Sequence, residues 1–184
     1  NLSTGGTLTI ADADAGEASF QAQAANGAYG SFSLATDGSW SYVASNSNAA
    51  IQSLGAGDTL TETFTVTSAD GTTSSVVVTI NGTNDAAVIS AGTGSVTEDV
   101  GVVGGNIATG GTLTIGDADG GEASFTAQST AGAYGSFTLA TNGAWTYTAL
   151  NTNPAIQTLG TGDTLTETFT VTSADGTTSS VVVT

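Results

Sequence analysis

The chain has 184 residues, among them 16 Asp and Glu and no Lys, Arg, His, Cys or Met, so its formal net charge is −16. Without basic side chains, the protein lacks the groups that bind the phosphates of nucleic acids or of anionic lipids. It also lacks an imidazole base, a thiol nucleophile and a cationic clamp for an oxyanion, which argues against most enzyme mechanisms.

The sequence contains two copies of one repeat. Residues 1–79 align without a gap with residues 106–184, and 61 of these 79 positions are identical. This period is that of one immunoglobulin-sized domain. We therefore expect a first domain over residues 1–83, which lacks its first strand, and a nearly complete second domain over residues 84–184. Because the chain starts and stops within a repeat, we expect it to be a fragment of a longer protein.

The local pattern predicts β-strands throughout. Short alternating runs rich in Thr, Val and aromatic residues are separated by Gly, Asn and Asp. In the second domain, strands are expected within 87–96 and at 112–115, 124–128, 136–140, 144–148, 165–172 and 180–183, with counterparts in the first domain at 7–10, 19–23, 60–67 and 75–80. Asp-Gly at 37–38 and Asn-Gly at 142–143 are typical of hairpin turns.

Seven antiparallel strands per repeat are arranged most economically as a β-sandwich. The sequence therefore predicts an all-β chain of two tandem sandwiches joined by a short linker. In the first domain, the expected core residues are Leu8, Ile10, Phe20, Phe32, Leu34, Trp40, Tyr42, Ile51, Leu60, Phe64, Val66 and Val78, and the second domain repeats this set.

The carboxylates are expected to gather at the ends of the sandwiches. Strand alternation places the loop 117–122 and the turn at Asp175 at the end of the second domain that faces the junction, and Asp58 at the facing end of the first. Oxygen-only ligands select hard cations, chiefly Ca²⁺. The predicted interdomain calcium site contains Asp58, Glu62, Asn84, Asp85, Asp117 and Asp119, and the half-sites for further neighbours contain Asp12, Asp14, Glu98, Asp99 and Asp163.

Two of these assignments have alternatives. Glu62 is in phase with the apolar residues of its strand, and an inward carboxylate without a basic partner is costly to ionise unless a metal ion compensates it. Alternatively, the strand begins after Glu62 or carries a bulge. Asp12 and Asp14 recur at positions 117 and 119, which favours metal ligation, but solvated loop acids are the alternative.

Several motifs together resemble the bacterial VCBS repeat over essentially the whole chain. They are the run V-T-S-A-D-G-T-T-S-S-V-V-V-T-I-N-G-T-N-D-A-A-V-I, the tetrapeptide T-E-D-V, and the patterns T-L-T-I-x-D-A-D-x-G-E-A-S-F and Y-G-S-F-x-L-A-T-x-G-x-W-x-Y. The resemblance implies cadherin- or immunoglobulin-like domains in giant RTX-type adhesins, type I secretion, and stiffening by calcium near Asn84-Asp85 and the D-A-D loop. Ala87 stands where the family often has Pro, which removes no ligand.

These observations favour a structural spacer over an enzyme. The function that we expect is that of calcium-rigidified extender repeats of a secreted bacterial adhesin, which support cell adhesion and biofilm formation at the cell surface. Neighbouring repeats of the same chain are the expected partners, and the protein is expected to be monomeric. No apolar run is long enough to span a bilayer.

The alternative function is a module that binds a sugar or a surface. Trp40 and Tyr42, and likewise Trp145 and Tyr147, could stack on a sugar, but their i, i+2 spacing on one strand face is more typical of a core. Alternating threonines at 59–67 could contact ice, although Thr is an ordinary residue on the solvent face of a strand. Paired carboxylates could catalyse glycoside hydrolysis, but nothing beyond their spacing supports an enzymatic function.

Overall fold

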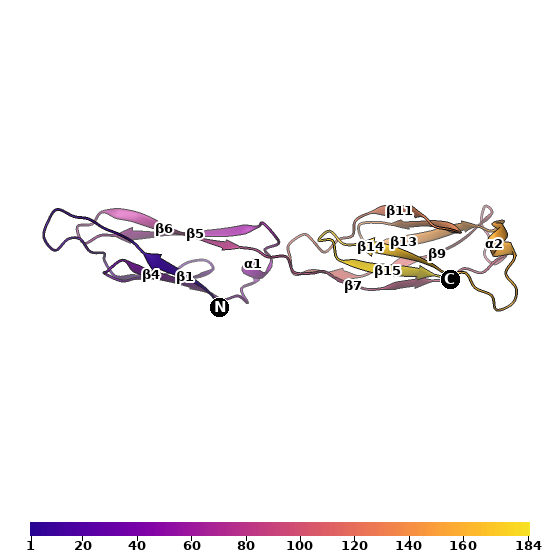
Figure 1. Ribbon diagram of the computed structural model, residues 1–184, viewed down its shortest axis with the longest axis horizontal. Helices are drawn as coiled ribbons and strands as arrows, with labels where there is room; N and C mark the ends of the chain where they lie inside the picture. Colours follow the sequence, from indigo (N-terminus) through magenta and orange to yellow (C-terminus); the bar gives the residue numbers. More distant parts are fainter. The chain divides into compact units, whose positions relative to one another are not determined.

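The computed structural model describes residues 1–184 and divides into two compact units, Asn1–Asn84 (unit 1) and Asp85–Thr184 (unit 2) (Figure 1). Strands occupy 47% of the residues and helices 4%, which confirms the predicted all-β fold.

Unit 1 consists of two facing sheets that enclose one core. Its elements are β1 (Leu2–Thr7), β2 (Gln23–Asn26), β3 (Gly30–Leu34), β4 (Ser39–Ala44), α1 (Ala49–Gln52), β5 (Thr59–Thr67) and β6 (Thr73–Asn81). The first sheet has the order β1-β4-β3-β2, the second contains only β5 and β6, and all pairs are antiparallel.

Unit 2 repeats this arrangement and adds three short strands, two of them at its start. Its elements are β7 (Val88–Ile89), β8 (Gly92–Gly94), β9 (Asn106–Thr112), β10 (Ile115–Gly116), β11 (Gln128–Ala131), β12 (Gly135–Leu139), β13 (Ala144–Leu150), α2 (Pro154–Gln157), β14 (Glu167–Thr172) and β15 (Thr178–Val183). The sheets have the orders β11-β12-β13-β9, β14-β15-β8 and β10-β7.

The strand predictions need four corrections. The strand expected within 87–96 is divided into β7 and β8, which join different sheets, and β8 pairs with β15 in parallel. The strands expected at 112–115 and 7–10 lie earlier, at Asn106–Thr112 and Leu2–Thr7, so each shares only one residue with its prediction. The strands expected at 124–128 and 19–23 begin only at Gln128 and Gln23, and Phe125 and Phe20 before them make isolated bridges. Finally, the short helices α1 and α2 were not expected.

Glycines explain why β1 and β9 were misplaced. Gly in a strand interior usually signals a bend, but it is also used where another group approaches the backbone closely. Gly111 lies against the indole of Trp145, and a Cβ at this position would lie 3.1 Å from its Nε1 atom. A Cβ at Gly110 would lie 2.7 Å from the Trp145 carbonyl oxygen. Gly110 and Gly111 therefore allow the backbone of β9 to pack closely against Trp145.

The predicted core is largely confirmed. In unit 1 the two sheets meet through Phe32 and Phe64, whose ring centroids are 4.7 Å apart with nearly parallel planes. Eight of the twelve expected residues are buried, and Leu8, Ile10, Trp40 and Leu60 are half-buried against them. The core also contains residues that were not expected, namely Ala44, Leu54, Val76 and Ile80.

Candidate metal centre

The acidic loop after β10 has the same internal structure as its counterpart in unit 1. The Asp119 N–H donates to Oδ1 of Asp117 over 2.9 Å, and the Asp14 N–H donates to Oδ1 of Asp12 over 2.8 Å. This local bond is characteristic of Asp in turns. A glycine in the left-handed region follows in each loop. The repeated D-A-D sequence thus folds each time into one turn that presents two carboxylates.

In unit 2 this turn contains buried carboxylate oxygens without a hydrogen-bond donor. Asp119 is only 3% exposed. Its Oδ2 accepts the N–H of Asp85 over 2.7 Å, but its Oδ1 has no donor, and neither has Oδ2 of Asp117. Burying an ionised carboxylate without compensation is costly, and the chain has no basic side chain that could pair with it. Such oxygens suit a bound hard cation.

Asp175 lies against the same segment of backbone but is differently engaged. Its carboxylate accepts the hydroxyl of Ser173, the N–H and hydroxyl of Thr177, and the N–H of Ala87 over 3.0 Å. These bonds, led by that of the Ser173 hydroxyl, hold the pKa of Asp175 well below its usual range. Asp119 and Asp175 therefore both fix the start of unit 2, and the sequence correctly assigned them to one end of the sandwich.

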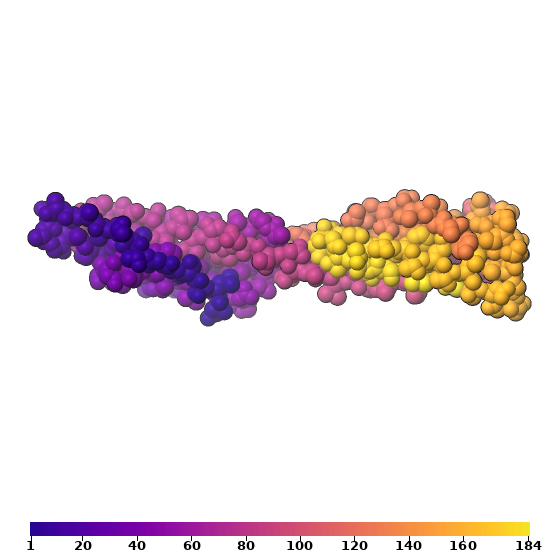
Figure 2. Space-filling view, in the orientation of Figure 1, coloured from indigo at the N-terminus to yellow at the C-terminus, as the bar shows by residue number.

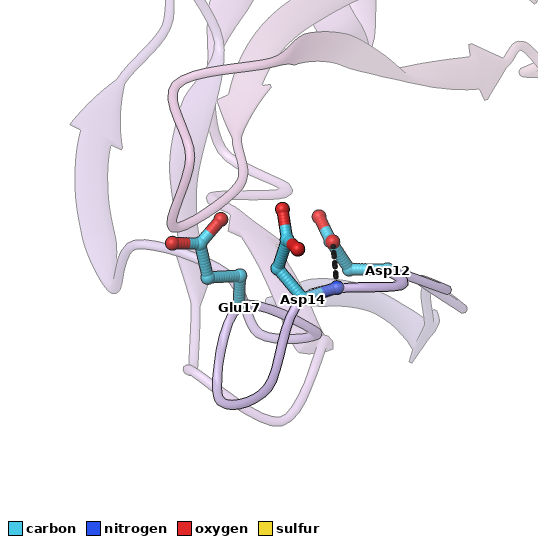
Figure 3. A group of neighbouring side chains, drawn as sticks. All are labelled: Asp12, Asp14 and Glu17. Carbon is cyan, nitrogen blue, oxygen red and sulfur yellow. Dashed lines mark hydrogen bonds between the residues drawn. The ribbon is translucent and has the colours of Figure 1, made fainter.

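In unit 1 the corresponding carboxylates form a three-membered cluster. Oxygens of Asp12, Asp14 and Glu17 all lie within 4.8 Å of one another. Figure 3 shows the three carboxylates on the same side of the loop. Asp12 is half-buried, and the other two are exposed. Glu17 was not among the predicted ligands, although its recurrence as Glu122 in the second repeat was a usable signal.

The other predicted ligands of unit 1 have local partners. Glu62 is 8% exposed, and its carboxylate accepts the N–H of Tyr29 over 3.1 Å and the hydroxyl of Tyr42. It lies in regular pairing within β5, so the alternatives of a late strand start and a bulge are wrong. Asp58 is exposed, and its Oδ2 accepts the Gly55 N–H over 3.3 Å. Asn84 is exposed as well.

The remaining predicted carboxylates lie elsewhere in unit 2. Glu98 and Asp163 line one cavity of about 400 Å³, together with Glu167. Oε2 of Glu98 is buried without a donor. Asp99 is engaged with Asn151 instead, through its N–H over 3.0 Å and its Oδ1 over 2.8 Å. The structure thus brings two of these three residues to one cavity.

No curated protein matches the sequence of this chain. The structure contains no helix with the length and apolar character needed to cross a membrane. The family model of the bacterial cadherin-like domain matches twice, over residues 1–82 and over residues 84–184. Since these two matches leave out only Thr83, the protein belongs to the family of bacterial cadherin-like domains.

Proposed function

We propose that the protein is a calcium-stiffened structural extender of a secreted bacterial adhesin of the RTX type, in which each VCBS-like repeat serves as a spacer domain. Domains of this family are typically non-enzymatic and extracellular, and they commonly bind Ca²⁺. Export by a type I system and a role in cell adhesion and biofilm formation are parts of the same proposal.

The observation that carries the proposal is the buried Asp119 in a chain without a basic residue. Its donor-free Oδ1 and the donor-free Oδ2 of Asp117 offer the hard oxygen ligands that Ca²⁺ prefers. When bound, the ion supplies the positive charge that the protein lacks. In unit 2 we assign Asp117 and Asp119 as its ligands, and in unit 1 Asp12, Asp14 and Glu17.

The proposed stiffening follows from the hydrogen bond that Asp119 already accepts from the backbone. Its other oxygen accepts the N–H of Asp85, the first residue of unit 2 after Asn84. An ion at Asp119 therefore restrains the backbone at the boundary between the units. The participation of Asp58, Glu62, Asn84 and the Asp85 side chain in this site remains a prediction from the sequence.

Burial weighs against the alternative of a sugar-binding module. Trp145 and Tyr147 are each 3% exposed and Tyr42 is 2% exposed, so their rings cannot stack on a sugar. Trp40 is half-buried against the core of unit 1. The aromatic residues that suggested this alternative therefore act in packing.

Calorimetric titration with calcium tests the proposal. We expect Asp119→Asn to weaken binding in unit 2 by about tenfold or more, because it removes a charged ligand. Asp37→Asn is the matched control. It removes the same charge from a hairpin turn, and the equivalent residue of unit 2 is already an asparagine, Asn142. The side chains of Asp37 and Asn142 each accept the N–H of the residue two positions later. Equal calcium binding by both variants, or no binding by the wild type, would contradict the proposal.

A further inference from the structure

Residues 85–87, the entry segment of unit 2, lie outside any strand. Two carboxylates from distant parts of the unit accept N–H groups of this segment. The N–H of Asp85 donates to Oδ2 of Asp119 over 2.7 Å. The N–H of Ala87 donates to Oδ2 of Asp175 over 3.0 Å. In Figure 2, yellow atoms from the last part of the chain lie beside the pink atoms with which unit 2 begins. The entry segment is therefore held by carboxylates at two points.

The two carboxylates differ in their remaining hydrogen bonds. Oδ1 of Asp119 is buried without a donor. In Asp175, Oδ1 accepts the hydroxyl of Ser173 and the N–H of Thr177. Its Oδ2 accepts the hydroxyl of Thr177 in addition to the N–H of Ala87. Because an ionised carboxylate offers about four lone-pair sites, protein donors saturate Asp175. Its hold on the entry segment therefore needs no metal ion.

The turn that carries Asp175 is attached to the residues that follow the acidic loop. The N–H of Ala174 donates to the carbonyl oxygen of Ser124 over 2.9 Å, and the N–H of Ser124 donates to that of Glu122 over 2.6 Å. Ser173, which binds Asp175, is only 1% exposed. Bonds within the folded sandwich thus fix the position of Asp175 relative to the acidic loop.

The hydrogen bond from Asp85 contributes to the orientation of Asp119. By occupying Oδ2, the N–H of Asp85 fixes the plane of the carboxylate and leaves Oδ1 for a cation. The N–H of Asp119 in turn occupies Oδ1 of Asp117 and leaves Oδ2 of that residue without a donor. Groups that orient ligands in this way raise metal affinity, because an oriented ligand loses less freedom on binding. The position of the entry segment is therefore part of the site.

We propose that Asp175 is a positioning residue of the calcium site in unit 2 and acts through the backbone of the entry segment. By holding the N–H of Ala87, it keeps the N–H of Asp85 in place against Asp119. Asp175 is not itself a ligand. The inference rests on the proposed function, since it presupposes an ion at Asp119.

Amide hydrogen exchange with a chelator present tests the positioning without any metal. In the unsubstituted chain, we expect the amides of Asp85 and Ala87 to be protected. In Asp175→Asn, the side-chain oxygen can still accept the bonds made to Oδ1, but the NH₂ group that replaces Oδ2 cannot accept the N–H of Ala87. This substitution should speed exchange of the Asp85 amide by about threefold or more, although its acceptor Asp119 is unchanged. Asp119→Asn should leave Ala87 protected.

Calcium affinity is the second readout, followed through the amide signal of Asp119 so that it reports on unit 2. Asp70→Asn is the matched control. It removes the same charge from the equivalent turn of unit 1, where Asp70 accepts the same bonds from Ser68 and Thr72. We expect Asp175→Asn to bind calcium at least about threefold more weakly than Asp70→Asn. The difference should persist in about 1 M salt, which screens the effect of a lost charge over distances beyond about 3 Å but does not restore orientation.

Three results would overturn the positioning role. They are an unprotected Ala87 amide in the unsubstituted chain without calcium, unchanged exchange of Asp85 in Asp175→Asn, and equal calcium affinities of Asp175→Asn and Asp70→Asn at high salt. The first needs no substitution, so it decides the matter even if Asp175→Asn destabilises unit 2. Failure of the proposed function is distinguishable, because the unsubstituted chain would then bind no calcium whatever the exchange rates.

Discussion

At the scale of single residues, the two inward glutamates show how the protein accommodates carboxylates in its core. Glu62 accepts the hydroxyl of Tyr42, and Glu167 accepts that of Tyr147 over 2.5 Å. A glycine lies against each carboxylate, and a Cβ at Gly27 would overlap Oε1 of Glu62. Tyrosine hydroxyls and backbone N–H groups thus take the place of the absent basic residues.

Tyr42→Phe tests this arrangement. The variant leaves a buried oxygen of Glu62 without its donor, so we expect the free energy of unfolding of unit 1 to fall by about 1–3 kcal/mol. Tyr29→Phe is the control, because Tyr29 bonds to Glu62 through its backbone N–H, which the substitution retains. Urea denaturation measures both variants, and equal stability of the two would contradict this account.

The same pairs predict a loss of stability in alkali. Burial, and next the hydrogen bond and charge of Glu62, raise the pKa of Tyr42, and Glu167 acts likewise on Tyr147. A raised pKa in the folded state means that the contribution to stability is complete below the ordinary tyrosine pKa of about 10 and is lost as the pH rises through the raised value. We therefore expect the thermal unfolding midpoint to decline as the pH rises above the ordinary tyrosine pKa of about 10. Midpoints that stay constant up to complete ionisation of tyrosine would contradict this.

At the scale of secondary-structure elements, the hairpins were the most predictable features. Asn-Gly or Asp-Gly between alternating runs correctly located β3–β4 and β12–β13. Strands whose sequence contains Gly-Gly were misplaced, because the close approach of a tryptophan is visible only after folding. The division of 87–96 was missed for a similar reason, since the change of sheet depends on where β10 and β15 lie.

Substitution of the hairpin glycine tests the turn. Gly143 has a φ of 85°, and a Cβ would lie 2.3 Å from the carbonyl oxygen of Leu113. We expect Gly143→Ala to destabilise unit 2 by about 1–3 kcal/mol through backbone strain and this overlap. At Gly116 a Cβ would meet no atom within 4 Å. Gly116→Ala should therefore leave the thermal midpoint nearly unchanged, and equal effects of the two substitutions would count against the argument.

The candidate metal site was predictable to the extent that it is local in sequence. Recurrence of the D-A-D loop in a chain without cations led to the prediction of Asp117 and Asp119 as ligands, and strand alternation placed Asp175 at the same end. The partners of Glu62 could not be foreseen, because its contact with Tyr42 connects two sheets. The pairing of Asp99 with Asn151 likewise depends on folding of the chain.

At the scale of the whole molecule, the net charge of −16 is the dominant constraint. Unpaired like charges oppose compaction, and bound divalent cations reduce this repulsion where carboxylates are buried. Under the proposed function, calcium therefore has two effects. It stabilises each acidic loop, and it restrains the boundary between the units through Asp119 and the backbone of Asp85.

The distance distribution between two spin labels tests the proposed stiffening most directly. Because the chain has no cysteine, Thr63→Cys and Thr168→Cys, at exposed equivalent positions of the two units, can be labelled specifically. We predict that saturating calcium narrows the distribution in this background and with Asp37→Asn, but not with Asp119→Asn. A distribution of equal width with calcium and with a chelator would contradict the calcium-stiffened extender.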